Sequence, residues 1–169
     1  LKQRHAHLND GPTSFEIGIK GDSETQECIT VEKVLIMLKQ YCNVPVHFQC
    51  ITSVDSILNI QSFKSKYNAS VSIGVSPFHC LFSDIMLTDY NQYLKFNPPL
   101  RSLETKNALH KMICNENDIQ HATSLHVPLV QDQHPQPFIA SPFGSETLPD
   151  YGVALSGILE SENAKLSRY

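Results

Sequence analysis

The heptapeptide Lys95–Arg101 reads KFNPPLR, and the rest of the chain is best interpreted from it. Proline fixes φ at about −65°, and the first proline disfavours the α conformation of the residue before it. Asn97 is therefore predicted to lie on a stiff, extended segment. Ser102 follows, with Glu104 in the next turn, which is typical of a helix N-terminus. The heptapeptide is either a rigid connector between a strand and a helix or a place for a fixed polar group.

On either side of this heptapeptide, apolar residues recur with the periods of strands and amphipathic helices. The predicted strands lie at 44–51, 71–75 and 119–124, and the predicted helices lie at 30–42, 53–68, 105–113 and 147–159. The inward face of the helix at 53–68 is predicted to carry Val54, Ile57, Leu58 and Phe63. Strands that alternate with helices favour an α/β fold with a parallel sheet and right-handed crossovers.

Length, charge and cysteine usage exclude several classes of protein. A chain of 169 residues with 41% hydrophobic residues is expected to form one domain around one core. A net charge of −4 without a block of like charges argues against nucleic acid or a membrane surface as the main partner. The longest apolar run, 34–38, is too short to span a bilayer, and no signal-peptide pattern is present, so a cytoplasmic location is expected. The five cysteines form no C-x-x-C pair and are predicted to be reduced thiols.

Six segments, in collinear order, resemble the signature segments of the dihydroorotases. These are zinc enzymes of the cyclic amidohydrolase superfamily that open and close the dihydroorotate ring. KFNPPLR resembles their K-x-N-P-P-L-R. The others are TSFEIGIKG at 13–21, VHFQCITS at 46–53, VSPFHCL at 75–81, ATSLHVPL at 122–129 and GSET at 144–147, which are similar to S-x-x-L-G-L-x-G, V-H-x-x-H-x-S-T, E-V-x-P-H-H-L-x, A-T-D-H-A-P-H and G-L-E-T. The resemblance links the chain to pyrimidine biosynthesis.

The resemblance also implies a fold class. Dihydroorotases are closed (β/α)8 TIM barrels, and such a barrel typically needs about 250 residues. This chain is too short to close one, so the expected fold is a partial (β/α)8 TIM barrel that corresponds to the second half. The dihydroorotase-like part is placed at 13–159, between a polar lead-in at 1–12 and a polar tail at 160–169.

The same resemblance implies metal ligands and a proton-transfer group at the ends of three strands, and this chain departs from the family at each. Cys50 stands where the first motif has a ligand histidine, Phe78 where the second has one, and Leu125 where the third has an aspartate. A thiolate can bind zinc, but phenylalanine and leucine cannot bind metal or titrate. No catalytic residue and no zinc cofactor are therefore expected, and the zinc site of the family is interpreted as lost.

Several polar residues remain as candidates for a site. Asn97 and Arg101 are candidates for substrate binding, although Arg101 is equally suited to binding the ends of nearby strands. An improvised metal site is the weaker alternative; its candidate ligands are His47, Cys50, His79, Cys80 and His126. The pair His5 and His7, which has the H-x-H spacing of a metal motif, follows no strand and is predicted to be solvated.

The expected function is that of a non-catalytic, dihydroorotase-like scaffold or interaction subunit. A partial barrel is expected to expose sheet edges and an apolar interior, which predicts a protein partner: a second copy, an intact dihydroorotase-like subunit or another protein of pyrimidine synthesis. Two alternatives stay open. One is a cyclic amidohydrolase that is active only with residues from another chain, and the other is a binding module for an anionic metabolite that resembles dihydroorotate.

Overall fold

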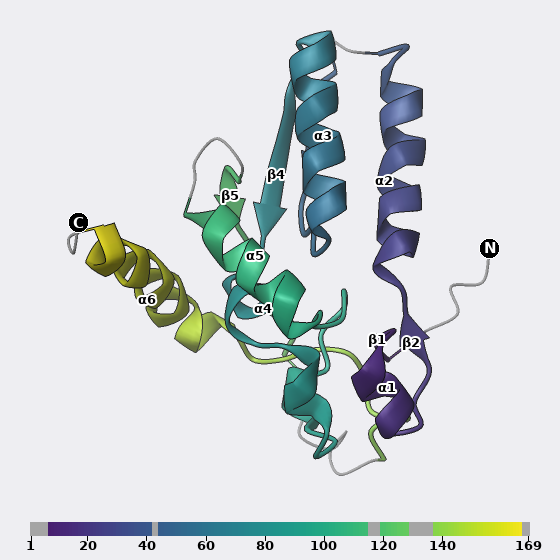
Figure 1. The fold of residues 1–169 in the computed structure, drawn as a ribbon, viewed down its shortest axis with the longest axis vertical. Coiled ribbons are helices and arrows are strands. Elements are labelled where there is room, and N and C mark those ends of the chain that lie inside the picture. Colours follow the sequence, from purple (N-terminus) through teal and green to yellow (C-terminus); the bar gives the residue numbers. More distant parts are fainter. Residues whose placement is uncertain (1–6, 42–43, 115–118, 129–136, 167–169) are drawn as a thin grey trace.

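The computed structural model describes residues 7–41, 44–114, 119–128 and 137–166, with side chains through residue 160. Its described helices alternate with short strands, and each strand pairing is parallel (Figure 1). The elements in chain order are β1 (Leu8–Asn9), α1 (Pro12–Glu16), β2 (Gly21–Asp22), α2 (Glu24–Leu38), β3 (Val46–Phe48), α3 (Val54–Tyr67), β4 (Val71–Val75), α4 (Pro77–Leu81), the 3-10 helices η1 (Asp84–Leu87) and η2 (Gln92–Leu94), α5 (Leu103–Ile113), β5 (His121–Ala122) and α6 (Leu148–Leu166). The predicted parallel α/β arrangement is confirmed.

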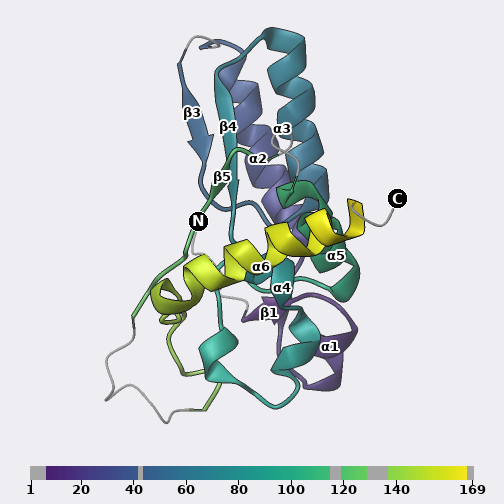
Figure 2. The same cartoon turned by 90° about the vertical axis from the view of Figure 1, so that its left-hand side faces the viewer.

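The larger sheet has the strand order β3-β4-β5 and forms the centre of the main core. Figures 1 and 2 show α2 and α3 on one side of this sheet, and no described helix on the opposite side of β3 and β4. The strand residues that face the helices are Val71, Ile73 and Val75 of β4, which pack with buried residues of α2, α3 and α5. Burial of this apolar surface is the main force that holds helices and sheet together.

Serine caps begin two of the predicted helices. The hydroxyl of Ser53 accepts a hydrogen bond from the N–H of Ser56 at 3.5 Å, and that of Ser102 accepts one from the N–H of Thr105 at 3.2 Å. Each bond satisfies a donor that has no partner within the helix. Asn68 ends α3 in the left-handed conformation, with φ of 46°. The predicted bounds of α3 are therefore confirmed, and the start of α5 follows Ser102 as predicted.

Other predicted bounds were wrong. The helix expected from Thr30 begins at Glu24 after the cap Ser23, and the Thr30 hydroxyl instead donates to the Gln26 carbonyl within the helix. The strand expected over 44–51 is limited to β3, and α6 continues past 159 to Leu166.

The inward face of α3 also differs from its prediction at one position. Leu58 is 47% exposed, whereas Ile60 is fully buried. The buried face of α3 is thus centred on Ile57, Ile60 and Phe63.

A second core lies below the larger sheet in Figure 1 and includes part of the segment that was predicted as a polar lead-in. There, β1 pairs with β2, and Leu8 is fully buried. Gly21 allows this pairing, since a Cβ atom there would lie 2.3 Å from the Cα of Asp10. The second core contains Leu8, Ile19, Phe78, Leu87, Phe96, Leu100, Phe138 and Ala154. Residues 8–12 therefore belong to the folded unit.

The open face of the larger sheet is polar, which corrects the expectation of an exposed apolar interior. Successive side chains of a strand point to opposite faces, so His47 and Ser72 face away from the helices. The Nδ1 atom of His47 lies 2.8 Å from the Ser72 hydroxyl, and the His47 ring contacts the ring of His121 edge-on at 4.8 Å. Gly74 lies between them. The sheet thus has one apolar face, packed with helices, and one face of polar side chains.

None of the described helices combines the length and the apolar composition that a membrane crossing requires.

Candidate functional site

Arg101, the last residue of the heptapeptide, lies at the centre of a buried polar network. Its side chain is 2% exposed. Its Nε atom donates to the Thr52 hydroxyl at 2.9 Å, and its Nη1 atom donates to Asn9 Oδ1 at 3.2 Å and to the Asp22 carbonyl at 3.1 Å. Its Nη2 atom lies 3.4 Å from a carboxylate oxygen of Glu27. Arg101 therefore connects β1, β2, α2 and the loop after β3.

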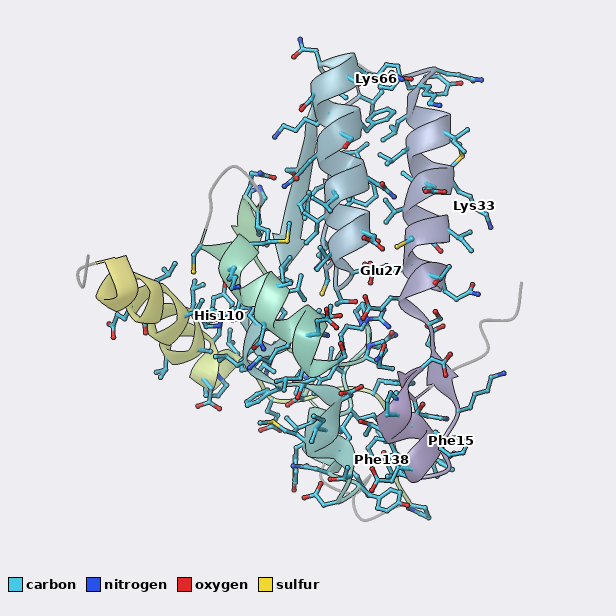
Figure 3. All side chains as sticks on the ribbon, viewed as in Figure 1. Phe15, Glu27, Lys33, Lys66, His110 and Phe138 are labelled. Carbon is cyan, nitrogen blue, oxygen red and sulfur yellow. The ribbon has the colours of Figure 1, made fainter. Side chains whose placement is uncertain are left out.

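Glu27 completes this network and was not identified from the sequence. Its carboxylate accepts hydrogen bonds from the N–H of Thr52 at 3.0 Å, the Thr52 hydroxyl at 2.6 Å and the N–H of Ser53 at 2.8 Å. Figure 3 shows Glu27 between the lower ends of α2 and α3. A carboxylate at this position satisfies free N–H groups at the start of α3 and interacts favourably with its helix dipole.

The two candidates for substrate binding lie in different environments. Asn97 is exposed on the segment that precedes Pro98, and the Asn97–Pro98 peptide bond is cis. The four contacts of Arg101 use most of the five N–H groups of its guanidinium. The geometry therefore favours the interpretation in which Arg101 binds strand ends, and Asn97 alone is open to a ligand.

His79 contacts the same heptapeptide through the carbonyl of Pro98. It is 1% exposed, and its Nε2 atom lies 2.9 Å from the Pro98 carbonyl, to which it donates. Burial lowers the pKa of His79 from 6.5 to about 4. The imidazole is thus neutral at pH 7 and fixes the position of Pro98, a structural role that needs no metal.

We predict that His79 makes the stability of the chain depend on pH. Because its folded-state pKa is about 4, the unfolded chain takes up this proton first as the pH falls, and stability is lost between about pH 6.5 and pH 4. The full loss is about 3 kcal/mol. Urea unfolding of the wild type and of His79→Gln at several pH values measures the difference. Parallel pH profiles of the two proteins would contradict the assignment.

Cys50, at the first metal position of the resemblance, has a thiol whose surroundings disfavour the thiolate. Burial and the nearby Glu27 carboxylate raise the pKa of the Cys50 thiol to about 12. A thiol must lose its proton to bind zinc, and this loss is strongly disfavoured at neutral pH. The environment of Cys50 therefore fits a protonated thiol.

Phe78, at the second metal position, is part of an aromatic stack. It is 5% exposed and lies 6.0 Å from the ring of Phe96 and 6.2 Å from that of Phe82. Leu125, at the aspartate position, is half-buried, has a φ of 49° and packs against the second core. Apolar packing thus occupies both positions.

The candidates for an improvised metal site are not brought together. His47 lies on the open sheet face, His79 is bound to Pro98, and the Nδ1 atom of His126 accepts a hydrogen bond from the N–H of Leu148 at 3.2 Å. Across the residues that the structure describes, no three histidine, cysteine, aspartate or glutamate side chains gather in a group that could hold a metal ion. The donor set does not fit the zinc of the resembled family.

Lys95, the first residue of the heptapeptide, is fully buried, which the sequence did not indicate. Its Nζ atom donates to the Phe138 carbonyl at 2.6 Å and to the Ser141 carbonyl at 2.5 Å. The same atom lies 5.0 Å from the ring centre of Phe138 and 4.9 Å from that of Phe143. Desolvation lowers the pKa of Lys95. The heptapeptide is therefore anchored at both ends, by Lys95 and by Arg101.

His7 of the H-x-H pair was predicted to be solvated, and the structure places it differently. It is half-buried, and its ring stacks on Phe143 at 5.6 Å. His5 lies outside the described residues.

Curated relatives resemble this chain over much of its length. The chain is 31% identical over 98 residues to a dihydroorotase of Ehrlichia canis, a match that covers 58% of this chain and 22% of that protein. It is 27% identical over 137 residues to a dihydroorotase of Macrococcus caseolyticus, which covers 81% of this chain and 31% of the relative. No protein-family model matches the sequence. The predicted resemblance to dihydroorotases is confirmed, and the chain spans less than a third of the length of these relatives.

Solved structures share the fold. Dihydropyrimidinase from Brevibacillus agri superposes with a TM-score of 0.69 at 16% identity, over 89% of this chain and 32% of that one. L-Hydantoinase from Arthrobacter aurescens superposes with a TM-score of 0.56 at 17% identity, over 78% of this chain and 25% of that one. Together with the parallel strands and helices described above, these matches confirm the predicted fold class, a partial (β/α)8 TIM barrel, whose described strands do not close a barrel.

Proposed function

We propose that this chain, which is related to the dihydroorotases in sequence and to the cyclic amidohydrolases in fold, does not itself open or close a cyclic amide and acts as an interaction subunit. The proposal that the chain is not catalytic rests on the side chains found at the three positions that the family uses for metal binding and proton transfer. They hold a thiol with a raised pKa at Cys50 and apolar, packed side chains at Phe78 and Leu125. Metal-assisted hydrolysis needs ligands and a titratable group at these places.

The heptapeptide gives independent support. In the dihydroorotases that the chain resembles, this motif contributes to substrate binding. In this chain, Lys95 and Arg101 are buried and form hydrogen bonds to protein groups. These contacts give the motif a structural reason to persist without catalysis. The anion-binding alternative has less support, because only Asn97 is exposed to a ligand.

A turnover assay on a chimera tests the non-catalytic proposal. Residues 13–159 replace the matching segment of the Macrococcus caseolyticus dihydroorotase, so that groups from the rest of the barrel are supplied. We expect no dihydroorotate hydrolysis with added zinc. The matched control carries Cys50→His, Phe78→His and Leu125→Asp in the same chimera and is expected to regain zinc binding. Turnover by the unrestored chimera would overturn the proposal, and circular dichroism verifies that both chimeras fold.

The interaction role is supported by the edges of the larger sheet. In the described structure, β3 and β5 each pair with β4 alone, so each has one free edge. Free edges offer unpaired backbone groups to another strand. We propose that a second polypeptide, either another copy or a dihydroorotase-like subunit, covers them. Sedimentation of the chain alone and mixed with an intact dihydroorotase tests this, and a monomer under both conditions would contradict it.

A further inference from the structure

A cavity of about 350 Å³ lies between α4, the segment around η2 and the first turns of α6. It is distinct from the polar network around Arg101. Four aromatic side chains line it, namely Phe78, Phe82, Tyr93 and Phe96. Two carboxylates, Glu146 and Asp150, line it as well. Its volume is within the range of about 300–1,000 Å³ that is common for small-molecule sites.

The aromatic wall of the cavity is fixed by the second core. Phe78 and Phe96 are 5% and 3% exposed, and their rings stack on each other with 6.0 Å between centres. The Phe82 ring also stacks on that of Phe78, with 6.2 Å between their centres. Aromatic faces carry partial negative charge and attract cations. Phe78 and Phe96 are buried in the stack and hold the wall in place, whereas the half-buried Phe82 and the exposed Tyr93 present aromatic surface to a ligand.

The charged groups of the cavity have one sign. Glu146 and Asp150 are exposed, and neither forms an ion pair with a described residue. No lysine, arginine or histidine is among the residues that line the cavity. Asp150 lies in the first turn of α6, where the helix dipole offsets part of its charge. Glu146, before the helix, is therefore the carboxylate that contributes more to the negative potential.

We propose that this cavity binds an organic cation, with its ammonium group between Glu146 and Asp150 and its apolar body against Phe82 and Tyr93. Cation–π attraction and two carboxylates select positive charge, and the apolar wall selects a hydrocarbon or aromatic substituent. The site would discriminate against anions such as carboxylates and phosphates, because it presents no positive donor to them. This inference does not depend on the proposed loss of catalysis.

The probe is benzyltrimethylammonium, titrated into the wild-type chain by isothermal titration calorimetry at low ionic strength. Saturable binding is expected, and NMR should show the largest methyl shifts at Val153 and Ala154, which line the cavity. The double variant Glu146→Gln with Asp150→Asn should bind about tenfold more weakly. Glu146→Gln alone should weaken binding more than Asp150→Asn alone. Phe82→Leu should also weaken it, since it removes an aromatic face.

A matched control has the same change of net charge far from the cavity. It carries Asp55→Asn and Glu104→Gln, which alter exposed acids in the first turns of α3 and α5, and it should bind as the wild type does. The role of the ligand's charge is tested by a titration with choline and one with its uncharged analogue 3,3-dimethylbutanol, which should bind more weakly. Absence of saturable binding, equal binding to the double variant and the control, or equal binding of the neutral analogue would each overturn the proposal.

Discussion

Replacement of Arg101 by methionine should lower the free energy of unfolding by about 3–5 kcal/mol, the range for breaking a buried ion pair by removing one partner. Methionine retains most of the apolar stem but donates no hydrogen bond. The variant would leave Glu27, which is 13% exposed, beside the start of α3 without its counter-charge. It would also leave Asn9 Oδ1 without the Arg101 donor, and the Asp22 carbonyl would keep only the N–H of Asp10.

Urea unfolding measures this loss, and two further variants identify its cause. Lys111→Met removes an exposed cation of α5 and should change stability by no more than about 0.5 kcal/mol. The double variant Arg101→Met with Glu27→Gln should be less destabilised than the sum of the single variants, because it removes both charges. A loss below about 1 kcal/mol for Arg101→Met would show that the network contributes little.

Replacement of Lys95 by methionine should cost about 2–4 kcal/mol, since the buried Ser141 carbonyl loses the Lys95 donor and the Phe138 carbonyl keeps only the Ser141 hydroxyl. The carbonyls of Phe138 and Ser141 lose their shortest contacts, and the rings of Phe138 and Phe143 lose a cation. Figure 3 shows Phe138 at the end of the molecule opposite the upper ends of α2 and α3. We therefore expect the destabilisation to be centred on the segment 137–144.

Hydrogen exchange distinguishes this local effect from general unfolding. In Lys95→Met, amides in the segment 137–144 should exchange faster than in the wild type by a larger factor than those of β4. Lys95→Arg tests the shape of the site, because a planar guanidinium does not reproduce the donor geometry of an ammonium group. Uniform acceleration across the chain, or none, would contradict an anchoring role for Lys95.

The parts of the fold that follow from local rules were predictable from the sequence. Ser53 and Ser102 were recognised as caps because a cap depends on a hydroxyl and the next few residues. The strand at Val71–Val75 was recognised because its side chains alternate. The start of α2 was missed since Ser23 and Thr30 are both suitable caps, and only packing decides between them.

The candidate site was harder to predict because its contacts join distant residues. Arg101 and Glu27 are 74 positions apart, and Lys95 and Ser141 are 46 apart, so no local pattern connects them. A lysine is also expected at the surface, and the burial of Lys95 depends on carbonyl groups that only the fold supplies. By contrast, the sequence alone shows that Phe78 and Leu125 cannot bind a metal, because neither side chain has a donor atom.

Zinc content shows whether the chain holds the metal that cyclic amide hydrolysis would need. The chain is purified with added zinc, dialysed and analysed for metal by mass spectrometry, and the chimera described above is treated in the same way with its restored variant alongside. We predict far less than one equivalent of zinc in the chain. The chimera that keeps Cys50, Phe78 and Leu125 should hold less zinc than the variant in which these three residues are restored. One or two zinc ions per chain, lost on replacement of Cys50 or His79, would contradict the account and show that these side chains form a metal site.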